Sequence, residues 1–365
     1  MSGPELVLDR WVLARANVNI ALIKYWGKVA SPAADPASPA ATAADKLSAT
    51  AVLDDANLPA VPSLSLTLAD LYTETRARFA PELEQDQVIL DDRALEGEEL
   101  RRAVLLLDAL RRRCDLASAF RVESRNFVPT AAGLASSASG MAALAAAAGG
   151  CAGLTPERDA PLLSELARIG SGSASRSIYG GWVAWEGRRA TPVAPPEHLP
   201  VAVVIAVIGK GRKSIGSRDA MNHTMRTSPF FSGWVQQAHA TFDDALNALK
   251  ERDFPRLMAA MERSTWRMHA SAMGADPPVF YWLPASVAVL GLVAALKAEG
   301  CVCGATLDAG PNVKVFCHPR DARMIAERLA VVPEVVQIVT SSPGAGIQVK
   351  IEPMQQPAGH GEVGR

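Results

Sequence analysis

The segment 129–140, PTAAGLASSASG, concentrates small residues and hydroxyls where an extended stretch enters an Ala-rich helical stretch. The first N–H groups of a helix lack intrahelical partners and the helix dipole is positive there, so such an end favours phosphate. Gly133 permits close backbone approach, and Ser136, Ser137 and Ser139 add hydroxyl donors. A capped Ser/Ala-rich helix without a ligand explains the same residues, and the GxxxxGK[ST] pattern of a P-loop is absent. Composition alone leaves both interpretations open.

A second group of candidate residues follows an apolar stretch near the N-terminus. In the string ANVNIALIKYWGK, Lys24 and Lys28 lie four residues apart beside Tyr25 and Trp26. Lysine binds phosphate as a point charge, so this pair suits an anionic ligand. A solvated strand end with a core tryptophan explains the same string, and the residues alone favour this second explanation.

Two further strings each place one charged side chain among small residues. The string SGSASRSIYGG holds Arg176, whose guanidinium can pair with a carboxylate while Ser171 and Ser173 donate hydrogen bonds. A turn with a surface arginine is the alternative. The string TLDAGPNVKVF holds Asp308 at the end of a predicted strand, before a Gly-Pro turn, where aspartate is usually a turn former. Neither string identifies a site by itself.

A basic, hydroxyl-rich run covers residues 209–231, GKGRKSIGSRDAMNHTMRTSPFF. Lys210, Arg212 and Lys213 suit the phosphates of a nucleotide. A solvated, mobile loop is the usual meaning of such a run of charges.

The hydrophobic pattern predicts the elements that position these strings. Strands are expected at 12–23, 63–80, 119–123, 178–186, 201–208, 301–307, 312–317 and 346–351. Helices are expected at 97–113, from the 129–140 segment to a stop at Gly149 and Gly150, and at 161–168, 233–251, 254–272 and 284–298. The stretch 30–56, rich in Ala, Pro, Ser and Asp, is expected to be a surface loop.

Length and composition limit the protein class. A chain of 365 residues with 49% hydrophobic and 21% charged residues is expected to form two globular domains. The Pro- and charge-rich stretch 186–200 suggests domains at 1–195 and 196–353, followed by a disordered tail at 354–365. The net charge of -1 disfavours nucleic acid as a partner. No apolar run is long enough to span a membrane and no signal peptide is evident, so a cytoplasmic protein is expected.

The histidines and cysteines do not indicate a metal site. The five cysteines contain no CxxC pair, and the six histidines lack metal-ligand spacing. The sequence therefore leaves any metal ligands unknown.

Taken in order along the chain, these strings resemble the diphosphomevalonate decarboxylase family. This family is a branch of the galactokinase, homoserine kinase, mevalonate kinase and phosphomevalonate kinase superfamily. The matches extend from residue 14 to residue 316, which makes them more specific than any single string. The resemblance implies a two-domain α+β fold. Its N-terminal domain is similar to domain 2 of ribosomal protein S5, and its C-terminal domain is ferredoxin-like.

The resemblance also implies roles for individual residues. Catalytic roles fall to Asp308, Lys24 and Arg176, with Asp308 acting on the substrate hydroxyl and Arg176 binding its carboxylate. Substrate binding falls to Asn19, Tyr25, Lys28, Ser171, Ser173, Ser217 and Arg218. Nucleotide binding falls to Gly133, Leu134, Ala135, Ser136, Ser137, Ser139, Lys213 and Met221, the last near the adenine.

The chain departs from the family pattern at one string. Residues 59–65 are PAVPSLS, so Val61 and Pro62 stand where the family usually has Asn and Ser. Proline also removes a donor N–H from this segment.

The activity implied is ATP- and Mg²⁺-dependent decarboxylation of (R)-5-diphosphomevalonate to isopentenyl diphosphate in isoprenoid biosynthesis, by a homodimer. A 3-phosphorylated intermediate is expected. A mevalonate 3-kinase and a phosphomevalonate decarboxylase are the enzymatic alternatives. A catalytically inactive ligand sensor on the same fold is the non-enzymatic one, and the intact Asp308 argues against it.

Overall fold

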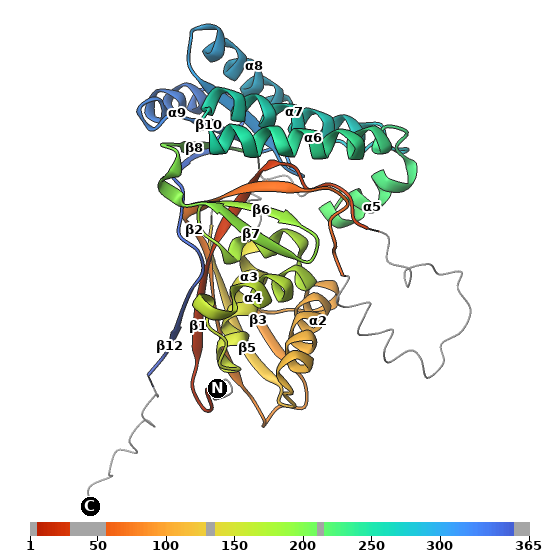
Figure 1. The fold of residues 1–365 in the computed structure, drawn as a ribbon, viewed down its shortest axis with the longest axis vertical. Helices are drawn as coiled ribbons and strands as arrows, with labels where there is room; N and C mark the ends of the chain where they lie inside the picture. The colour runs from red at the N-terminus through yellow and green to blue at the C-terminus, as the bar shows by residue number, and fades with distance from the viewer. Residues whose placement is uncertain (1–5, 30–55, 129–135, 210–214, 354–365) are drawn as a thin grey trace, which may run out of the picture.

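Two β-sheets and the helices packed on them make up the protein (Figure 1). The computed structural model describes residues 6–29, 56–128, 136–209 and 215–353. The predicted α+β class is confirmed. The tail at 354–365 and, apart from Ala56, the predicted loop at 30–56 lie outside the described residues.

The first sheet is mixed and has eight strands in the described part of the chain. Six follow the order β12-β1-β2-β5-β3-β4, while β6 pairs with β2 and β7 pairs with β6. Among these described strands, only β3 and β5 pair in parallel. The bounds are β1 Val12–Ile23, β2 Ser63–Phe79, β3 Gln87–Leu90, β4 Arg93–Ala94, β5 Phe120–Phe127, β6 Trp182–Glu186, β7 Arg189–Ala194 and β12 Gln348–Ile351.

Strand β12, near the C-terminus, lies beside β1, near the N-terminus. Its residues pair antiparallel with β1, in the register Val12 to Ile351. A segment from the far end of the sequence therefore completes the first sheet. The boundary between residues 195 and 196 stays a prediction.

The second sheet is antiparallel, with the order β11-β8-β10-β9. Its strands are β8 Ala202–Ile208, β9 Cys303–Leu307, β10 Val313–Cys317 and β11 Val335–Ser341. Every residue of β8, β9 and β10 is buried, because helices cover both faces. Helices α8 (Pro284–Ala298) and α9 (Ala322–Ala330) connect these strands in the β-α-β-β-α-β order of a ferredoxin-like unit.

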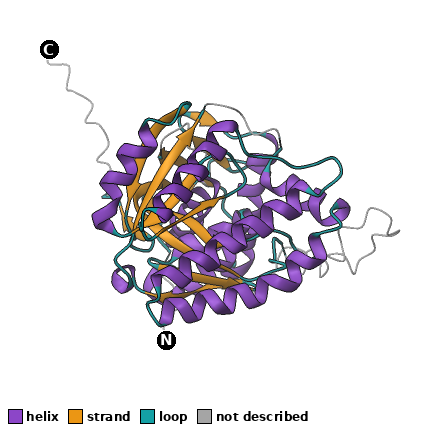
Figure 2. Ribbon diagram, turned by 90° about the horizontal axis from the view of Figure 1, so that it is seen from above, coloured by secondary structure: helices purple, strands orange, loops and turns teal. Residues whose placement is uncertain are grey.

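The remaining helices pack on one sheet or between the two. Their bounds are α2 Gly97–Cys114, α3 Ser136–Cys151, α4 Pro156–Gly170, α5 Ser217–Thr227, α6 Phe231–Lys250 and α7 Phe254–Met273, with 3₁₀ turns at Gly172–Ile178, Pro196–His198 and Pro319–Asp321. Helices α6 and α7 run side by side (Figure 1) and share a buried cluster with β1, β2 and β8. Figure 2 shows the helices and strands from above. In the described part of the chain, no helix combines the length and the apolar character that a membrane span requires.

Helix α3 differs from the prediction at its C-terminal end. Gly149 and Gly150 were expected to stop the helix, but α3 continues through them to Cys151. A Cβ on Gly150 would lie 2.6 Å from Val12, and one on Gly149 would lie 2.8 Å from Leu163. These glycines therefore allow close packing of α3 against β1 and α4.

Several short elements were not predicted. The hydrophobic pattern did not predict strands β3, β4, β7 and β11 or helix α9. Each is short and contains exposed residues, so its hydrophobic pattern is weak. Helix α5 lies inside the basic run that was interpreted as a loop. Its buried Ala220, Met221 and Thr224 provide the apolar face.

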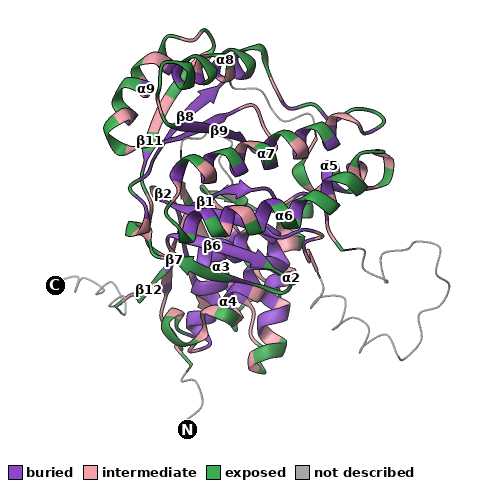
Figure 3. Cartoon of the chain, turned by 45° about the horizontal axis from the view of Figure 1, so that its top comes forward, coloured by how far each residue is buried: buried purple, intermediate pink, exposed green. Residues whose placement is uncertain are grey.

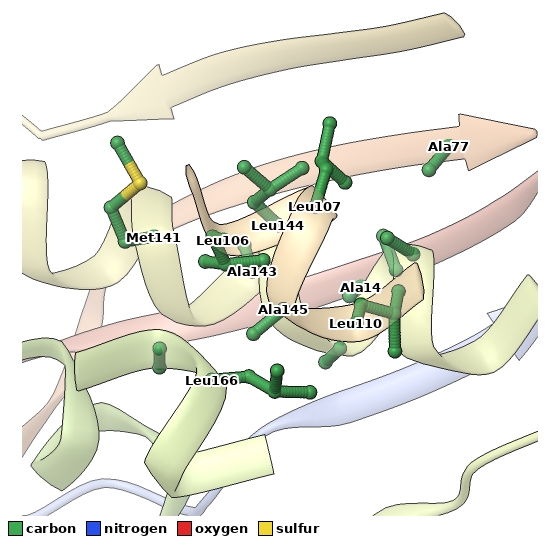
Figure 4. Packing of buried hydrophobic residues seen from close by; sticks show 14 of the residues in the cluster. Ala14, Ala77, Leu106, Leu107, Leu110, Met141, Ala143, Leu144, Ala145 and Leu166 are labelled. Carbon is green, nitrogen blue, oxygen red and sulfur yellow. The ribbon is translucent and has the colours of Figure 1, made fainter. Parts of the chain in front are cut away.

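The core of the first sheet joins its strands β1, β2 and β5 to helices α2, α3 and α4 (Figure 4). Figure 3 colours most of β1, β8 and β9 as buried, whereas α6 and α7 carry both buried and exposed residues. Leu106, Leu107 and Leu110 of α2 are fully buried there, as are Ala143 and Ala145 of α3.

Truncating Leu106 to alanine is expected to destabilise the protein by about 2–5 kcal/mol, because the lost packing leaves a cavity. Chemical denaturation measures this. The matched control is Val287→Ala, at a residue that is 54% exposed; its free energy of unfolding should change by no more than about 0.5 kcal/mol. Equal losses in the two variants would contradict this account of the core.

Candidate active site

A pocket of about 180 Å³ brings together most of the side chains that the sequence predicted. Its walls come from the end of β1, the 3₁₀ turn Gly172–Ile178, helix α5 and the turn after β9. Predicted residues that line it are Asn19, Lys24, Tyr25, Lys28, Ser137, Ser171, Ser173, Arg176, Ser217, Arg218, Met221 and Asp308.

Asp308 is held at this pocket by two lysines. Lys24 Nζ donates to Asp308 Oδ1 at 2.6 Å, and Lys314 Nζ donates to Oδ2 at 2.9 Å. The lysine side chains are only 2% and 4% exposed, whereas that of Asp308 is 37% exposed. The carboxylate is therefore anchored from behind and open toward the pocket.

The charges around Asp308 determine its protonation. Burial raises the pKa of Asp308, but the charges of and hydrogen bonds from Lys24 and Lys314 outweigh burial and hold this pKa well below its usual range. Burial lowers the pKa of Lys24 to about 8, with Asp308 opposing and Lys314 and Arg176 adding to the decrease. At neutral pH the carboxylate is ionised and both neighbours are cations.

Arg176 is fixed beside this group from two strands. Its Nε donates to Asn19 Oδ1 at 3.2 Å, and its Nη1 donates to Ser63 Oγ at 2.6 Å. Asn19 in turn donates to the Ser173 carbonyl and to Ser177 Oγ. Burial lowers the pKa of Arg176 to about 10, which leaves it charged at neutral pH. A fixed guanidinium whose remaining N–H groups have no partner among the described residues suits a carboxylate.

A second cationic region lies around Lys28. Its ammonium donates to Asn57 Oδ1 at 2.9 Å, and Asn57 donates to the carbonyls of Arg168 and Ile169 at the end of α4. Asn57 has a φ of 59°, a left-handed conformation that asparagine tolerates. Burial lowers the pKa of Lys28 to about 8.

Tyr25 and Arg102 present polar atoms that suit a ligand. The Tyr25 hydroxyl and the Arg102 Nε are buried and have no hydrogen-bond partner among the described residues. Both side chains line the pocket. Arg218, from α5, also lines it and pairs with Glu98 of α2 at 3.2 Å. This part of the pocket is therefore strongly basic.

A smaller apolar pocket of about 110 Å³ adjoins the first one. Ser137 and Arg102 line both pockets, and its apolar walls come from Val88, Leu90, Leu95, Ala103, Met141 and Leu144. Ser137 lies in the first turn of α3, which carries no acidic side chain. A flat apolar group and an attached anion fit this pair of pockets.

The comparisons with known proteins agree with this geometry. Residues 16–192 match the family model of the diphosphomevalonate decarboxylase-like N-terminal domain, and residues 203–355 match that of the mevalonate 5-diphosphate decarboxylase C-terminal domain. A diphosphomevalonate decarboxylase of Candida albicans is 32% identical over 323 residues, which cover 82% of each chain. The chain belongs to the diphosphomevalonate decarboxylase family.

Solved structures of this family share the whole fold. A mevalonate diphosphate decarboxylase from Staphylococcus aureus has a TM-score of 0.81 and 36% identity, covering 93% of this chain and 98% of its own. A structure of a protein designated MDDEF, in complex with MVAPP, AMPPCP and magnesium, has a TM-score of 0.80 and 37% identity, covering 93% and 99%. The predicted family and two-domain fold are confirmed.

Some residues with predicted roles lie away from the pocket or outside the described residues. Ser139 is fully buried and its hydroxyl forms a 2.8 Å hydrogen bond with Thr73, so the structure does not bring it to the pocket. Met221 lines the larger pocket, not the apolar one. Gly133, Leu134, Ala135 and Lys213 lie outside the described residues, as do Lys210 and Arg212, and nothing is described of the Ser136 side chain.

The departure from the family pattern at Val61 and Pro62 affects the core beside the site. Val61 is 2% exposed and packs in the cluster that contains Trp26 and Met221. Ser63, two residues later, accepts the hydrogen bond from Arg176. Val61 therefore contributes packing, while Ser63 makes the polar contact between this segment and Arg176.

Sequence reasoning missed four residues at or beside the site: Ser63, Asn57, Arg102 and Lys314. Asn57 and Arg102 lie outside the strings that drew attention, Ser63 lies in the string that was noted only for Val61 and Pro62, and Lys314 was treated as part of a strand. A lysine in the middle of an otherwise apolar strand was the one available signal. In the described part of the chain, no three His, Cys, Asp or Glu side chains are grouped to hold a metal ion.

Replacing Asp308 by asparagine is expected to destabilise the free protein by roughly 1–3 kcal/mol at pH 7, because two buried ammoniums lose their counter-charge. Asp308 raises the pKa of Lys24, so the variant should release this proton at lower pH. The difference from the unmodified protein should shrink between about pH 7 and pH 9, as Lys24 becomes neutral in the variant. Chemical denaturation at both pH values measures it.

The control is Asp92→Asn, whose side chain is 84% exposed and pairs with Arg125 only at 3.4 Å. This change should leave stability nearly unaltered at both pH values. A penalty for Asp308→Asn that grows with pH would contradict the proposed charge balance.

Proposed function

We propose that this protein catalyses the ATP-dependent decarboxylation of (R)-5-diphosphomevalonate to isopentenyl diphosphate, releasing ADP, phosphate and carbon dioxide. The observation that carries the proposal is one pocket in which the ionised Asp308 faces Arg176 and a separate group of cations. A substrate with a hydroxyl, a carboxylate and a diphosphate is complementary to these three parts.

The substrate is bound by charge and hydrogen bonding. Lys28, Arg218 and the Tyr25 hydroxyl take the diphosphate, together with Ser171, Ser173 and Ser217, which line the same pocket. Arg176 takes the carboxylate, with Asn19 fixing the guanidinium plane. Two anionic groups at opposite ends leave little freedom for the tertiary hydroxyl, which lies at Asp308. Positioning is therefore a main contribution to the rate.

ATP fits the two adjoining pockets as co-substrate. The apolar pocket accepts the adenine, and Ser137, the first turn of α3 and the unpaired Nε of Arg102 suit the phosphates. Magnesium would offset the negative charge of the phosphates when bound. The Ser137 hydroxyl, which lines both pockets, would hold it together with the nucleotide.

Phosphoryl transfer comes first. Asp308 accepts a hydrogen bond from the C3 hydroxyl and directs its oxygen toward the γ-phosphorus. As the new P–O bond forms, the bond between the γ-phosphorus and the bridging oxygen of ADP breaks. The hydroxyl proton passes to Asp308. Because the carboxylate is weakly basic between its two lysines, this proton leaves as the oxygen gains its bond to phosphorus, not before.

Decarboxylation follows from the better leaving group. The C3–O bond breaks and its electron pair leaves with phosphate. The electrons of the C1–C2 bond form the C2–C3 double bond, and carbon dioxide departs. Lys24 and Arg176 stabilise the departing phosphate and orient the carboxylate. The homodimer and the cytoplasmic location implied by the resemblance stay predictions.

Incubation with Mg-ATP and diphosphomevalonate should release ADP and carbon dioxide in equal amounts. Asp308→Ala should lower both rates at least roughly 100-fold, since it removes the acceptor for the hydroxyl proton. Glu327→Ala, at a side chain of α9 that is 64% exposed and lines neither pocket, should leave both unchanged. ADP without carbon dioxide would indicate a kinase, and release of neither would overturn the proposal for this substrate.

Arg218→Met tests the assignment of the diphosphate. Loss of one charged hydrogen-bonding partner should lower kcat/KM for diphosphomevalonate roughly 10- to 100-fold. The corresponding value for phosphomevalonate should change less. Arg101→Met is the matched control, because Arg101 also pairs with Glu98 but does not line the pocket. Equal effects of Arg218→Met on both substrates would contradict the assignment.

A further inference from the structure

Lys314 is a buried cation that the mechanism above does not use. It lies in β10, where all five residues are buried, and its side chain is 4% exposed. Its backbone pairs with Thr306 on one side and Ile205 on the other. A cation in the centre of a sheet is costly unless it is paired, and the partner that the described residues give its ammonium is Asp308 Oδ2, at 2.9 Å.

We propose that Lys314 is a positioning residue of the active site, which anchors the second oxygen of Asp308 and sets the charge state of the Asp308–Lys24 pair. It does not touch the substrate, because it lies behind the carboxylate. The test of this role by enzyme turnover rests on the proposed function, whereas the test by the titration of Lys24 does not.

The geometry explains the anchoring. Lys24 follows β1 of the first sheet and holds Oδ1, while Lys314 lies in β10 of the second sheet and holds Oδ2. With one oxygen held from each sheet, the carboxylate cannot rotate about its Cβ–Cγ bond without breaking a charged hydrogen bond. The Asp308 side chain is nevertheless 37% exposed and lines the pocket.

The electrostatics explain the charge state. The charged or titratable groups that face Asp308 are Lys24, Lys314, Arg176 and His269 of α7. Burial lowers the pKa of His269 to about 3, so this ring is neutral. Three cations then surround one carboxylate, and the centre keeps a net positive charge for an anionic substrate. Lys314 also repels the Lys24 proton and helps to lower the pKa of Lys24.

This repulsion gives a test that a merely structural role would not pass. In Lys314→Met, Lys24 loses a neighbouring cation, so its titration midpoint should move above the value of about 8 in the unmodified protein. The midpoint is measured in the ligand-free protein by NMR of ¹³C-labelled lysine side chains, with the Lys24 signal assigned through Lys24→Arg. Lys314→Arg keeps the charge and should keep the midpoint.

The same substitution should change catalysis with Mg-ATP and diphosphomevalonate. Turnover by Lys314→Met should fall roughly 10- to 100-fold, because the carboxylate loses one anchor. The alkaline limb of kcat/KM should move to higher pH, following Lys24. Lys28 also titrates near pH 8, but Lys314 is not among the charges that shift it, so the movement reports Lys24. Lys314→Arg should recover most of the rate.

Lys297→Met is the control, since Lys297 pairs with Glu262 on the surface and does not line the pocket. It should leave the Lys24 midpoint and the rate unchanged. If Lys314→Met does not fold, Lys314→Gln replaces it in the same comparison. A Lys24 midpoint that stays at its original value or falls would overturn the proposal, even with activity lost. A raised midpoint in a protein whose unmodified form releases no carbon dioxide would support the charge assignment while refuting the proposed function.

Discussion

The salt bridge that joins Asp308 to Lys24 and Lys314 is the interaction on which the site depends. It connects the end of β1 in the first sheet with β10 in the second, and both ammoniums are almost wholly buried. A buried cation without a partner would be strongly unfavourable, so each lysine requires the carboxylate in its place. The salt bridge therefore links the two sheets and leaves Asp308 open to the pocket.

The packing around this salt bridge also links the two sheets. Helices α6 and α7 fill the space between the sheets, and the backbone N–H of Lys24 donates to Ser264 of α7 at 2.9 Å. At the other side, Asn57 ties Lys28 to the end of α4, close to the turn that carries Arg176. Lys24 and Arg176, the cations nearest Asp308, are therefore held inside the packed interior, whereas Arg218 lies at its edge.

This arrangement favours chemistry that needs charge and position more than a strong base. The two lysines keep Asp308 ionised but weakly basic. Such a carboxylate orients a hydroxyl well and accepts its proton only when the oxygen has become acidic through a new bond. Arg176, buried and held by Asn19 and Ser63, aligns a carboxylate in the same pocket. Phosphorylation and decarboxylation can then share one set of residues.

The sequence by itself determined the long elements through their hydrophobic period. It determined the family, and with it the α+β class, through the resemblance of several strings of neighbouring residues. The same resemblance pointed to Asp308 and Arg176, which their own strings did not identify. Only the tertiary structure decided which groups pair with them. Lys314 appeared to be one residue of a strand, and Ser139 appeared to be a ligand donor, until their partners were known. Burial and pairing between residues distant in sequence set the charge of a group, and no local pattern contains that information.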